Sequence, residues 1–369
     1  MIRVDDKTIF DPIKFSFLNC QAEYRLAEKI PVESNAVVCK KNIKRLTVFV
    51  TNSCNLACPY CYERKKEPQI MSQPCAKKIC EIFGEKLEGI LYFGGEPLLQ
   101  LASLKAIHEI FRSMLPNARY KIITNGLLLD DSVAEWLSLA NIKDVGISWD
   151  GFGDTSRYGY NKQLSEIVLN KIIYFSLNTD LNISVRMTVN ETSVEELNAS
   201  IKVLVENGIP VLIEPAFDYV KMDISKHIHD VLIPFYGNLG SQISMLANYK
   251  NIEALLASGT YKYYGCSAGR HSLKINTDGS IYDCHRMLLN PNNYLGDIYK
   301  INSVDEIDNS SYYYYKCNLR SECAQCEYRF LCGGGCVYSH SLRNCDVKKA
   351  MLDAILKEIW RREKEKIGN

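Results

Sequence analysis

The sequence predicts an α/β fold built around a parallel sheet. Apolar, β-branched stretches alternate with helical patterns between about residues 46 and 217. Each parallel crossover needs a helix, so this alternation indicates six βα units in series. A partial or full barrel fits the series better than an open sheet, although periodicity alone does not decide between them. The predicted strands are Leu46–Val50, Ile90–Phe93, Tyr120–Ile123, Val145–Trp149, Ile183–Val189 and Val211–Ile213.

The regions before and between these strands follow a simple order. Residues 1–45 are weakly patterned, and we expect an N-terminal extension of short strands. Within residues 46–217, apolar residues at helical spacing predict the crossover helices. These helices include Leu101–Met114, Ser132–Leu139, Ser165–Leu177 and Val194–Asn207.

The last two fifths of the chain differ in character from the strand–helix region. Residues 218–265 are rich in Tyr and predict a helical connector. Residues 266–345 have many Gly, dense Cys and few long periodic runs, as in a small domain held by metal rather than by a large apolar core. Residues 346–369 contain an amphipathic helix, predicted from Lys348 to Lys366.

Composition excludes several functional classes. The chain has 369 residues, with 44 Lys and Arg against 43 Asp and Glu. This balance gives no case for a nucleic-acid or anionic-membrane partner. The sequence has neither the roughly 18-residue apolar run of a membrane span nor a basic-then-apolar secretion signal. We therefore expect a soluble cytoplasmic protein.

The cysteines are the unusual feature. Of the 15, eight lie between Cys266 and Cys345, and three more lie between Cys54 and Cys61. Thiols in a chain without a secretion signal stay reduced. Clustered cysteines in such a chain indicate metal binding rather than disulfides.

The strongest local motif is CNLACPYC, which spaces its cysteines as Cys54-x3-Cys58-x2-Cys61. It directly follows the first predicted strand, so its loop lies at a carboxyl end. Three thiolates on one short loop can hold three irons of a [4Fe–4S] cluster and leave the fourth iron open to a small molecule. The alternative is a zinc knuckle, but no fourth Cys or His lies nearby in the sequence.

Polar or Gly-rich motifs follow the other predicted strands. They are Gly94-Gly95-Glu96-Pro97, Thr124-Asn125-Gly126, Ser148-x-Asp150-Gly151, Arg186 within VRMTV, and Glu214-Pro215. Each is weak alone, because Asn-Gly and Asp-Gly are ordinary turn sequences. Functional groups of parallel α/β proteins gather at the carboxyl ends of strands, so together these motifs predict one site.

CxxxCxxC with an aromatic residue before the third Cys, followed by GGEP, resembles the radical S-adenosylmethionine (SAM) superfamily. The resemblance implies a partial (β/α)6 TIM-like barrel, with Cys54, Cys58 and Cys61 as the catalytic cluster ligands. That family cleaves SAM to methionine and a 5′-deoxyadenosyl radical. By the same resemblance, Gly94, Gly95 and Glu96 bind the methionine amine, Tyr60 lies beside the adenine, and Ser148 contacts the ribose or carboxylate. Asn125 and Arg186 belong to the same pocket. For Arg186 and Glu214, an ion pair at the strand ends is the alternative.

The C-terminal cysteines resemble a SPASM domain, which holds two auxiliary [4Fe–4S] clusters in superfamily members that modify peptides and proteins. The pattern is Cys266-x12-Gly279-x4-Cys284, then Cys323-x2-Cys326-x5-Cys332-x3-Cys336, then Cys345. The resemblance assigns Cys323, Cys326, Cys332 and Cys345 to the second auxiliary cluster. It assigns Cys266, Cys284 and Cys336 to the first.

The sequence does not decide the fourth ligand of the first auxiliary cluster. Cys317 is one candidate, and a vacant iron that binds a substrate thiolate is the alternative that we favour. Zinc is the alternative for the whole region, but the CxxC at Cys323 has no mate of matching spacing. Cys20, Cys39, Cys75 and Cys80 are expected to be buried small hydrophobic residues. Three [4Fe–4S] clusters and SAM are therefore the expected cofactors.

The expected function is modification of a ribosomally made peptide. Sulfatase-maturing relatives place an Asp after the Cys that corresponds to Cys284, and this chain has His285 there. The strings CHRM and YRFLCGGGC look more like peptide maturases, several of which form thioether crosslinks. A carbon–carbon crosslink or a side-chain oxidation by the same machinery is the alternative. A cluster-bearing scaffold without catalysis is the non-enzyme alternative.

The resemblance to peptide maturases also implies binding partners. The substrate is a precursor peptide, and the electron donor is a reductant such as flavodoxin or ferredoxin. The roughly 45 residues before the barrel are short for a leader-recognition domain of winged-helix type. We therefore expect either a separate leader-recognition protein or direct leader binding by the barrel and connector.

Overall fold

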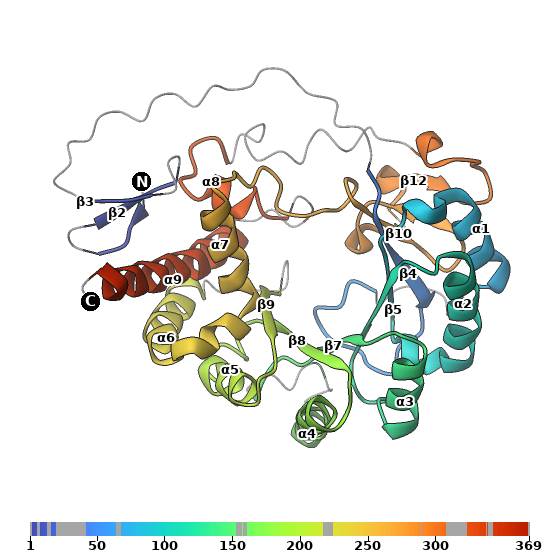
Figure 1. Ribbon diagram of the computed structural model, residues 1–369, viewed down its shortest axis with the longest axis horizontal. Coiled ribbons are helices and arrows are strands. Elements are labelled where there is room, and N and C mark those ends of the chain that lie inside the picture. The colour runs from blue at the N-terminus through green and yellow to red at the C-terminus, as the bar shows by residue number, and fades with distance from the viewer. Residues whose placement is uncertain are drawn as a thin grey trace. The chain divides into compact units, whose positions relative to one another are not determined.

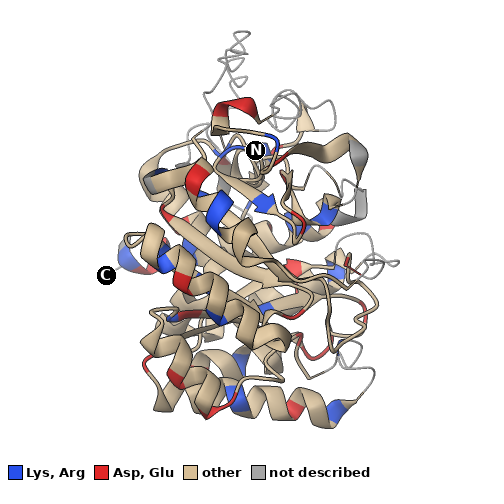
Figure 2. Cartoon of the chain, turned by 90° about the vertical axis from the view of Figure 1, so that its right-hand side faces the viewer, with Lys and Arg blue, Asp and Glu red and all other residues tan. Residues whose placement is uncertain are grey.

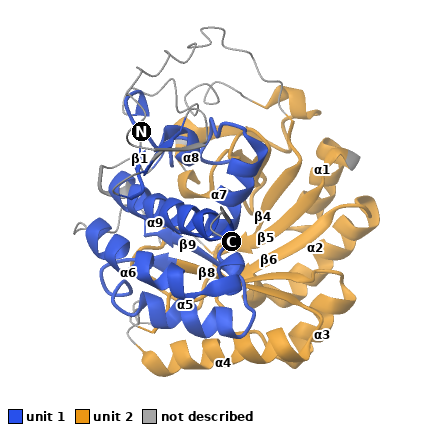
Figure 3. Ribbon diagram, turned by 60° about the vertical axis from the view of Figure 1, so that its left-hand side comes forward, with its two compact units in different colours: residues 1–38, 188–266, 313–369 blue, residues 39–187, 267–312 orange. Residues whose placement is uncertain are grey.

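The computed structural model (Figure 1) describes residues 2–5, 8–12, 16–19, 42–63, 68–152, 157, 161–216, 224–288, 290–307, 323–336, 338 and 342–367. The chain divides into two compact units (Figure 3). Unit 2 comprises residues 39–187 and 267–312. Unit 1 comprises residues 1–38, 188–266 and 313–369.

Unit 2 is organised by a sheet in the strand order β12-β11-β10-β4-β5-β6-β7-β8. The strands β4 to β8 pair in parallel, each with the next along the chain. All five were predicted to within one residue at either end. Their bounds are β4 Arg45–Thr51, β5 Gly89–Gly94, β6 Arg119–Thr124, β7 Asp144–Ser148 and β8 Asn182–Val189. The fold class is α/β with a parallel sheet that forms a partial barrel, as predicted.

Helices follow the first four of these strands, and α1, α3 and α4 begin at side-chain caps. The Ser72 hydroxyl accepts the Cys75 amide at the start of α1, and Asp130 accepts the Val133 amide (2.9 Å) at the start of α3. Such caps satisfy amides that have no partner within the helix. The helix α2 has the bounds predicted from its sequence. The bounds are α1 Gln73–Phe83, α2 Leu101–Met114, α3 Asp131–Leu139 and α4 Lys162–Asn178.

Alternation along the strands separates a helix-covered face from a second face. Tyr92 of β5 is buried, and its hydroxyl lies 2.8 Å from His108 Nδ1 of α2, so its face is the one the helices cover. Successive side chains of a strand point to opposite faces. Phe93 therefore belongs to the second face. In Figure 1, α1, α2 and α3 lie along the outer side of β4 to β7.

The sheet continues beyond β4 through a hairpin from late in the sequence. β10 (Ser272–Ile275) pairs in parallel with β4, and β11 (Ser280–Tyr282) and β12 (Tyr294–Asp297) add to it antiparallel. Lys274 Nζ donates to Thr47 Oγ1 (3.0 Å) across this pairing. These strands were not predicted, because short runs between Gly and Cys carry little periodic signal.

Unit 1 combines a small antiparallel sheet with helices. Three short strands lie within residues 1–45, where an extension of short strands was predicted. Trp360 Nε1 of the last helix donates to Asp5 Oδ2 (2.8 Å). The helix α9 begins six residues before its predicted start and packs along α6 (Figure 1). The bounds are β1 Ile2–Arg3, β2 Thr8–Asp11, β3 Ser16–Asn19, α5 Leu197–Glu206, β9 Val211–Pro215, α6 Ser225–Asn238, α7 Ala247–Ser258, α8 Arg329–Cys332 and α9 Leu342–Ile367.

Within unit 1, β9 lies beside the end of β8. The last two residues of β8 belong to this unit, and the Ala216 amide after β9 donates to the Val189 carbonyl (2.8 Å). The helices α6 and α7 lie within residues 218–265, where a helical connector was predicted. Within the described ranges, no helix combines the length and apolar character that crossing a membrane requires.

Candidate functional site

The loop after β4 carries the first three cysteines. The Thr51 hydroxyl accepts the Ser53 amide (3.1 Å), and the Cys61 amide donates to the Cys58 carbonyl (3.0 Å). These bonds turn the chain so that Cys54 is exposed, Cys58 is buried and Cys61 is half-buried. The predicted ligands therefore lie on one short, folded loop at the carboxyl end of a parallel strand.

The surroundings of these thiols have two opposing effects on their pKa values. Burial raises the pKa of Cys58 to about 11 and also raises the pKa of Cys54. Backbone amides donate toward two sulfurs, Leu56 to Cys54 Sγ (3.4 Å) and Glu63 to Cys61 Sγ (3.3 Å). Amide donors stabilise thiolates and tune iron–sulfur centres. A bound metal centre would displace the protons that burial otherwise retains.

The GGEP motif packs directly against this loop. The Gly95 amide donates to the Thr51 carbonyl (2.9 Å), and the Glu96 amide donates to the Ser53 carbonyl (2.8 Å). A Cβ atom on Gly94 or on Gly95 would lie 2.2 Å from a carbonyl oxygen of Thr51 or Ser53, respectively. Only Gly allows this approach. The first two strand ends thus form one continuous surface.

Gly94→Ala should lower the free energy of unfolding by about 2–4 kcal/mol. Gly94 has φ +147°, which is unfavourable for Ala, and the added Cβ would clash with the Thr51 backbone. Gly84 is the matched control, since it has φ +55° but no neighbour within 4 Å of an added Cβ. Its replacement by Ala should cost about 1–2 kcal/mol. Urea unfolding of both variants measures the difference, and equal losses would contradict the close approach.

Glu96 is buried, and its carboxylate accepts hydrogen bonds from two neighbouring strand ends. Oε1 accepts the Leu98 amide (3.0 Å) and the Thr124 hydroxyl (2.7 Å), and Oε2 accepts the Asn125 amide (2.7 Å). Burial raises the pKa of Glu96 to about 7, against the opposing effect of these donors. A buried carboxylate poised in this way is suited to bind a cation.

Asn125 joins a third strand end to the cysteine loop. Its Nδ2 donates to Asn55 Oδ1 (2.8 Å), and its Oδ1 accepts the Leu127 amide (3.0 Å). Because Asn55 follows Cys54 directly, the side chain of Asn125 lies beside the first cysteine. The structure therefore brings together the predicted residues of β4, β5 and β6.

Tyr60 takes part in a buried polar cluster at the end of β7. Its hydroxyl donates to Asp150 Oδ2. Arg157 donates to both oxygens of Asp150, from Nε (2.8 Å) and Nη2 (2.9 Å), and its guanidinium lies 5.5 Å from the centre of the Tyr60 ring. The Arg157 carbonyl also accepts from Cys58 Sγ (3.5 Å). The positive charge of Arg157 opposes the burial that raises the pKa of Cys58.

Ser148 and Arg186 lie side by side on the second face of the sheet. They are register partners of β7 and β8, and both are half-buried. Lys121 of β6 shares this face, and burial lowers its pKa, with a smaller effect from Arg186. Within unit 1, Glu214 Oε1 lies 3.4 Å from Lys348 Nζ of α9.

The segment after β11 packs against the same loop. The His285 ring lies 4.9 Å from the ring of Tyr62 and 5.8 Å from that of Phe93, centre to centre. Arg286 lies over the Tyr62 ring at 5.8 Å. Cys284 is buried, and its sulfur accepts the Arg286 amide (3.4 Å). Within unit 2, the CHRM string therefore lies beside the residue that follows Cys61.

A second set of cysteines lies in unit 1. Burial raises the pKa of Cys345, and the neighbouring thiols of Cys332, Cys323 and Cys326 raise it further. Repulsion of this kind acts only between groups that lie close together. The four thiols, Cys323, Cys326, Cys332 and Cys345, are the ones that the sequence resemblance assigns to the second auxiliary cluster. Within the described residues, no three His, Cys, Asp or Glu side chains converge on the position of a single metal ion.

The triple Gly beside these cysteines brings two backbone segments into contact. A Cβ on Gly333 would lie 2.4 Å from the Tyr264 backbone carbon, and one on Gly265 would lie 2.2 Å from the Gly335 carbonyl oxygen. The triple Gly therefore lies in close contact with the backbone just before Cys266. A Cβ on Gly335 would also lie 3.8 Å from Cys332 Sγ.

Other predicted residues are placed as follows. Cys75 and Cys80 are buried in α1, as predicted for small hydrophobic side chains. Cys266 ends the middle segment of unit 1, and Cys336 belongs to the same unit. Cys20, Cys39 and Cys317 lie outside the described residues.

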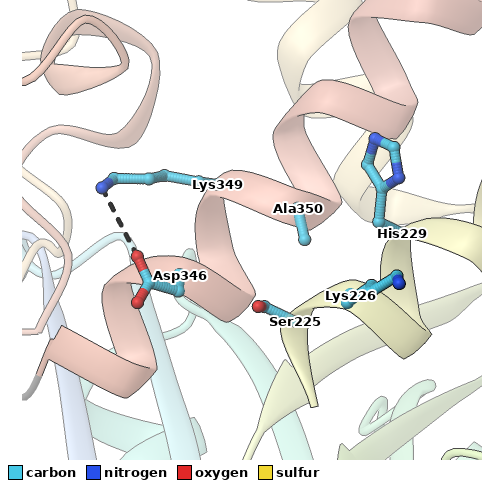
Figure 4. Close-up of a pocket in the computed structure, with 6 residues that line it drawn as sticks. All are labelled: Ser225, Lys226, His229, Asp346, Lys349 and Ala350. Atoms are coloured by element: carbon cyan, nitrogen blue, oxygen red, sulfur yellow. Dashed lines mark hydrogen bonds and ion pairs between the residues drawn. The ribbon is translucent and has the colours of Figure 1, made fainter. Parts of the chain in front are cut away.

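Unit 1 also has a shallow pocket of about 280 Å³ between α6 and α9 (Figure 4). Its lining residues are Ser225, Lys226, His229, Asp346, Lys349 and Ala350, none of which was predicted to be functional. Figure 2 shows acidic and basic residues interspersed along the helices, in keeping with the net charge of +1.

The comparisons with known proteins identify the part of the chain that holds the first site. Residues 48–216, which begin in β4 and end after β9, match the sequence model of the Radical SAM superfamily. The match covers a little under half of the chain. A radical SAM domain over this segment would hold SAM and one [4Fe–4S] cluster as cofactors. The three thiols at the end of β4 and the adjoining Gly-Gly-Glu surface fit these cofactors.

Similarity to other proteins extends beyond that segment. An uncharacterized protein of Methanocaldococcus jannaschii is 28% identical over 66% of this chain and 85% of its own. The radical SAM cyclopropyl synthase TigE of Paramaledivibacter caminithermalis is 23% identical over 85% of this chain and 71% of its own.

Solved structures show the same fold. The structure of anSMEcpe with bound AdoMet and Kp18Cys peptide has a TM-score of 0.69 at 18% identity, covering 87% of this chain and 99% of its own. That of Streptococcus suis SuiB bound to precursor peptide SuiA has a TM-score of 0.57 at 16% identity, covering 80% and 72%.

Sequence reasoning missed several residues around the site at the cysteine loop. Asp150 and Thr124 belong to the polar motifs that follow the predicted strands. Only neighbouring residues in those motifs were predicted to be part of the site. Arg157 had no motif at all, being a single cation in a Gly-rich stretch after β7. The only available signal was a charged residue near a strand end already expected to be functional.

Proposed function

We propose that this chain is a radical SAM enzyme that modifies a ribosomally made peptide, with a thioether between a Cys sulfur and a carbon as its product. The observation that carries the proposal is the presence of two separate sets of thiols. One set lies on the loop after β4 in unit 2. The other, in unit 1, includes Cys345 and the three thiols that raise its pKa. Cleavage of SAM requires only the first set.

The first set would hold the SAM-binding cluster through Cys54, Cys58 and Cys61. When bound, the cluster and SAM supply a 5′-deoxyadenosyl radical, which removes hydrogen from an unactivated carbon. The buried Glu96 carboxylate would bind the methionine ammonium, because it is held at the required edge by three donors. Gly94 and Gly95 leave room for the backbone there, and Tyr60, Asn125, Ser148 and Arg186 would line the rest of the pocket.

The second set would hold an auxiliary [4Fe–4S] cluster through Cys323, Cys326, Cys332 and Cys345. Cys266, Cys284 and Cys336 would bind another, with Cys317 or a substrate thiolate as the fourth ligand. We favour the substrate thiolate, because no Cys occurs between Cys266 and Cys284. A thiolate held there would be placed to join a carbon radical.

Similarity to peptide-binding proteins supports the substrate class. Two proteins of the same fold have been solved with peptides, anSMEcpe with Kp18Cys peptide and SuiB with precursor peptide SuiA. By analogy, the substrate would be a precursor peptide, with a flavodoxin or ferredoxin as reductant. A separate recognition protein would supply leader binding if this chain alone binds the peptide weakly.

The decisive experiment is mass spectrometry of a candidate Cys-containing precursor peptide after anaerobic turnover, with and without alkylation. A thioether removes two hydrogens and leaves one fewer thiol to alkylate. The control peptide has Ser in place of each Cys, and it should remain unmodified. Cys317→Ala should form the same product if a substrate thiolate takes the fourth position. An unmodified Cys peptide together with normal SAM cleavage would contradict the proposal for that substrate class.

Carbon–carbon bond formation is the second candidate, favoured by the similarity to the cyclopropyl synthase TigE. It also removes two hydrogens, but every thiol of the product would still react with the alkylating reagent. The control peptide with Ser in place of Cys would then be modified as well. The two candidates therefore predict opposite results in the same measurement.

A further inference from the structure

A buried ion pair lies directly behind the cysteine loop. The Asp150 side chain is 0% exposed and that of Arg157 is 11% exposed. The pair is bidentate, with Arg157 Nε and Nη2 each donating to one carboxylate oxygen. Isolated charges in such a position are costly, and only good geometry with further hydrogen bonds offsets the loss of hydration.

The same pair contacts two residues of the cysteine loop. Asp150 accepts the Tyr60 hydroxyl, and the Arg157 guanidinium faces the Tyr60 ring at 5.5 Å. The Arg157 carbonyl accepts from Cys58 Sγ (3.5 Å). Arg157 therefore connects the end of β7 to a cluster cysteine and to the aromatic residue beside it. Each of these contacts lies within unit 2.

We propose that Arg157 is a positioning residue that, through Asp150, fixes the Cys58–Tyr60 part of the loop and thereby the aromatic surface on which SAM binds. This inference rests on the proposed role of Tyr60 in the SAM pocket. A planar guanidinium suits the task, because it can form two parallel bonds to a carboxylate and still stack over a ring. Lys would retain the charge but neither of these geometries.

The experiment compares Arg157→Gln, Asp150→Asn and the double variant with wild type. The first readout is hydrogen–deuterium exchange of residues 54–61 in the purified, cofactor-free protein, with α2 as the internal reference. The second is the dissociation constant for SAM after cluster reconstitution, with the iron content determined. The control is Arg112→Gln, which removes an exposed hydrogen bond to the Leu139 carbonyl in the same unit.

Arg157→Gln should speed exchange in the loop and weaken SAM binding by about 10- to 100-fold at unchanged iron content, as loss of supporting hydrogen bonds around a metal site does. The double variant should be no weaker than Arg157→Gln, because both changes break one network. Arg157→Lys should recover only part of the affinity. Arg112→Gln should match wild type in both readouts.

Wild-type exchange and wild-type SAM affinity in Arg157→Gln would overturn the inference. If that variant fails to fold, Tyr60→Phe takes its place, since it removes only the hydroxyl that Asp150 accepts. It should weaken SAM binding at an unchanged melting temperature, and unchanged binding would again overturn the inference. Absence of SAM binding in reconstituted wild type would instead contradict the proposed function, and loop exchange would still decide the positioning role.

Discussion

The variant Cys54→Ala/Cys58→Ala/Cys61→Ala should lose all SAM cleavage while keeping about eight of about twelve irons per chain, since three cubane clusters carry four irons each. The loss is confined because the three thiols lie on one loop in unit 2. Cys345 and the thiols that raise its pKa lie in unit 1. Iron and sulfide analysis after anaerobic reconstitution measures the count, and detection of 5′-deoxyadenosine measures cleavage.

The control for this variant is Cys75→Ala/Cys80→Ala. Both thiols are buried in α1 and belong to the same unit as the loop. It should keep about twelve irons and full cleavage. Retained cleavage in the triple variant would contradict the assignment of the first site. About four irons in wild type would contradict the auxiliary clusters and leave only the SAM-binding one.

The second large effect is expected at Glu96. Its carboxylate would bind the methionine ammonium in the ionised form, and burial raises its pKa to about 7. Protonation below that pH removes the charge, so SAM affinity should fall by up to about tenfold per pH unit below pH 7. Glu96→Gln should lower affinity at pH 8 by about 10- to 100-fold, the value of one charge-assisted hydrogen bond.

A rise in pH should have the opposite effect on folding stability: ionisation of Glu96 strengthens SAM binding but lowers the free energy of unfolding. A pKa raised in the folded state stabilises the protein below the unfolded pKa of about 4.5, and this contribution is lost as the pH rises through 7. The loss for cofactor-free protein is about 3 kcal/mol. Glu96→Gln should remove this pH dependence. Urea unfolding between pH 4.5 and 8 measures it.

Glu88→Gln is the matched control for both measurements at Glu96. Glu88 is exposed and pairs with Lys44, and that hydrogen bond lowers its pKa. Its replacement should leave SAM affinity and its pH profile unchanged. A wild-type pH profile in Glu96→Gln would assign the titration to another group and contradict the proposed ammonium site.

The sequence was informative where structure is local. The apolar runs predicted β4 to β8 to within one residue, because buried parallel strands are short and β-branched. The α2 boundaries were found because its apolar positions repeat at helical spacing up to Met114. The motif residues Glu96 and Asn125 were found because strand order alone brings carboxyl ends together.

Non-local features were missed for a physical reason. β10 has four residues, and only its pairing with β4 makes it part of the sheet. Arg157 is seven residues from Asp150, and the Gly-rich sequence between them carries no periodic pattern that would predict their contact. The positions of His285 and Arg286 beside Tyr62 depend on the same long-range pairing. No periodic pattern in one sequence encodes such contacts.

The insertion of β10 beside β4 has a consequence for synthesis of the protein. The Asn52 side chain at the start of the cysteine loop donates to Thr277 Oγ1, 225 residues further along the chain (3.2 Å). While the ribosome is still making the intervening residues, β4 has an unpaired edge that is open to aggregation. Cluster assembly on the nascent chain would precede completion of this neighbourhood. We therefore expect efficient cofactor loading only after β10 and Thr277 have been made, with chaperones protecting the exposed edge until then.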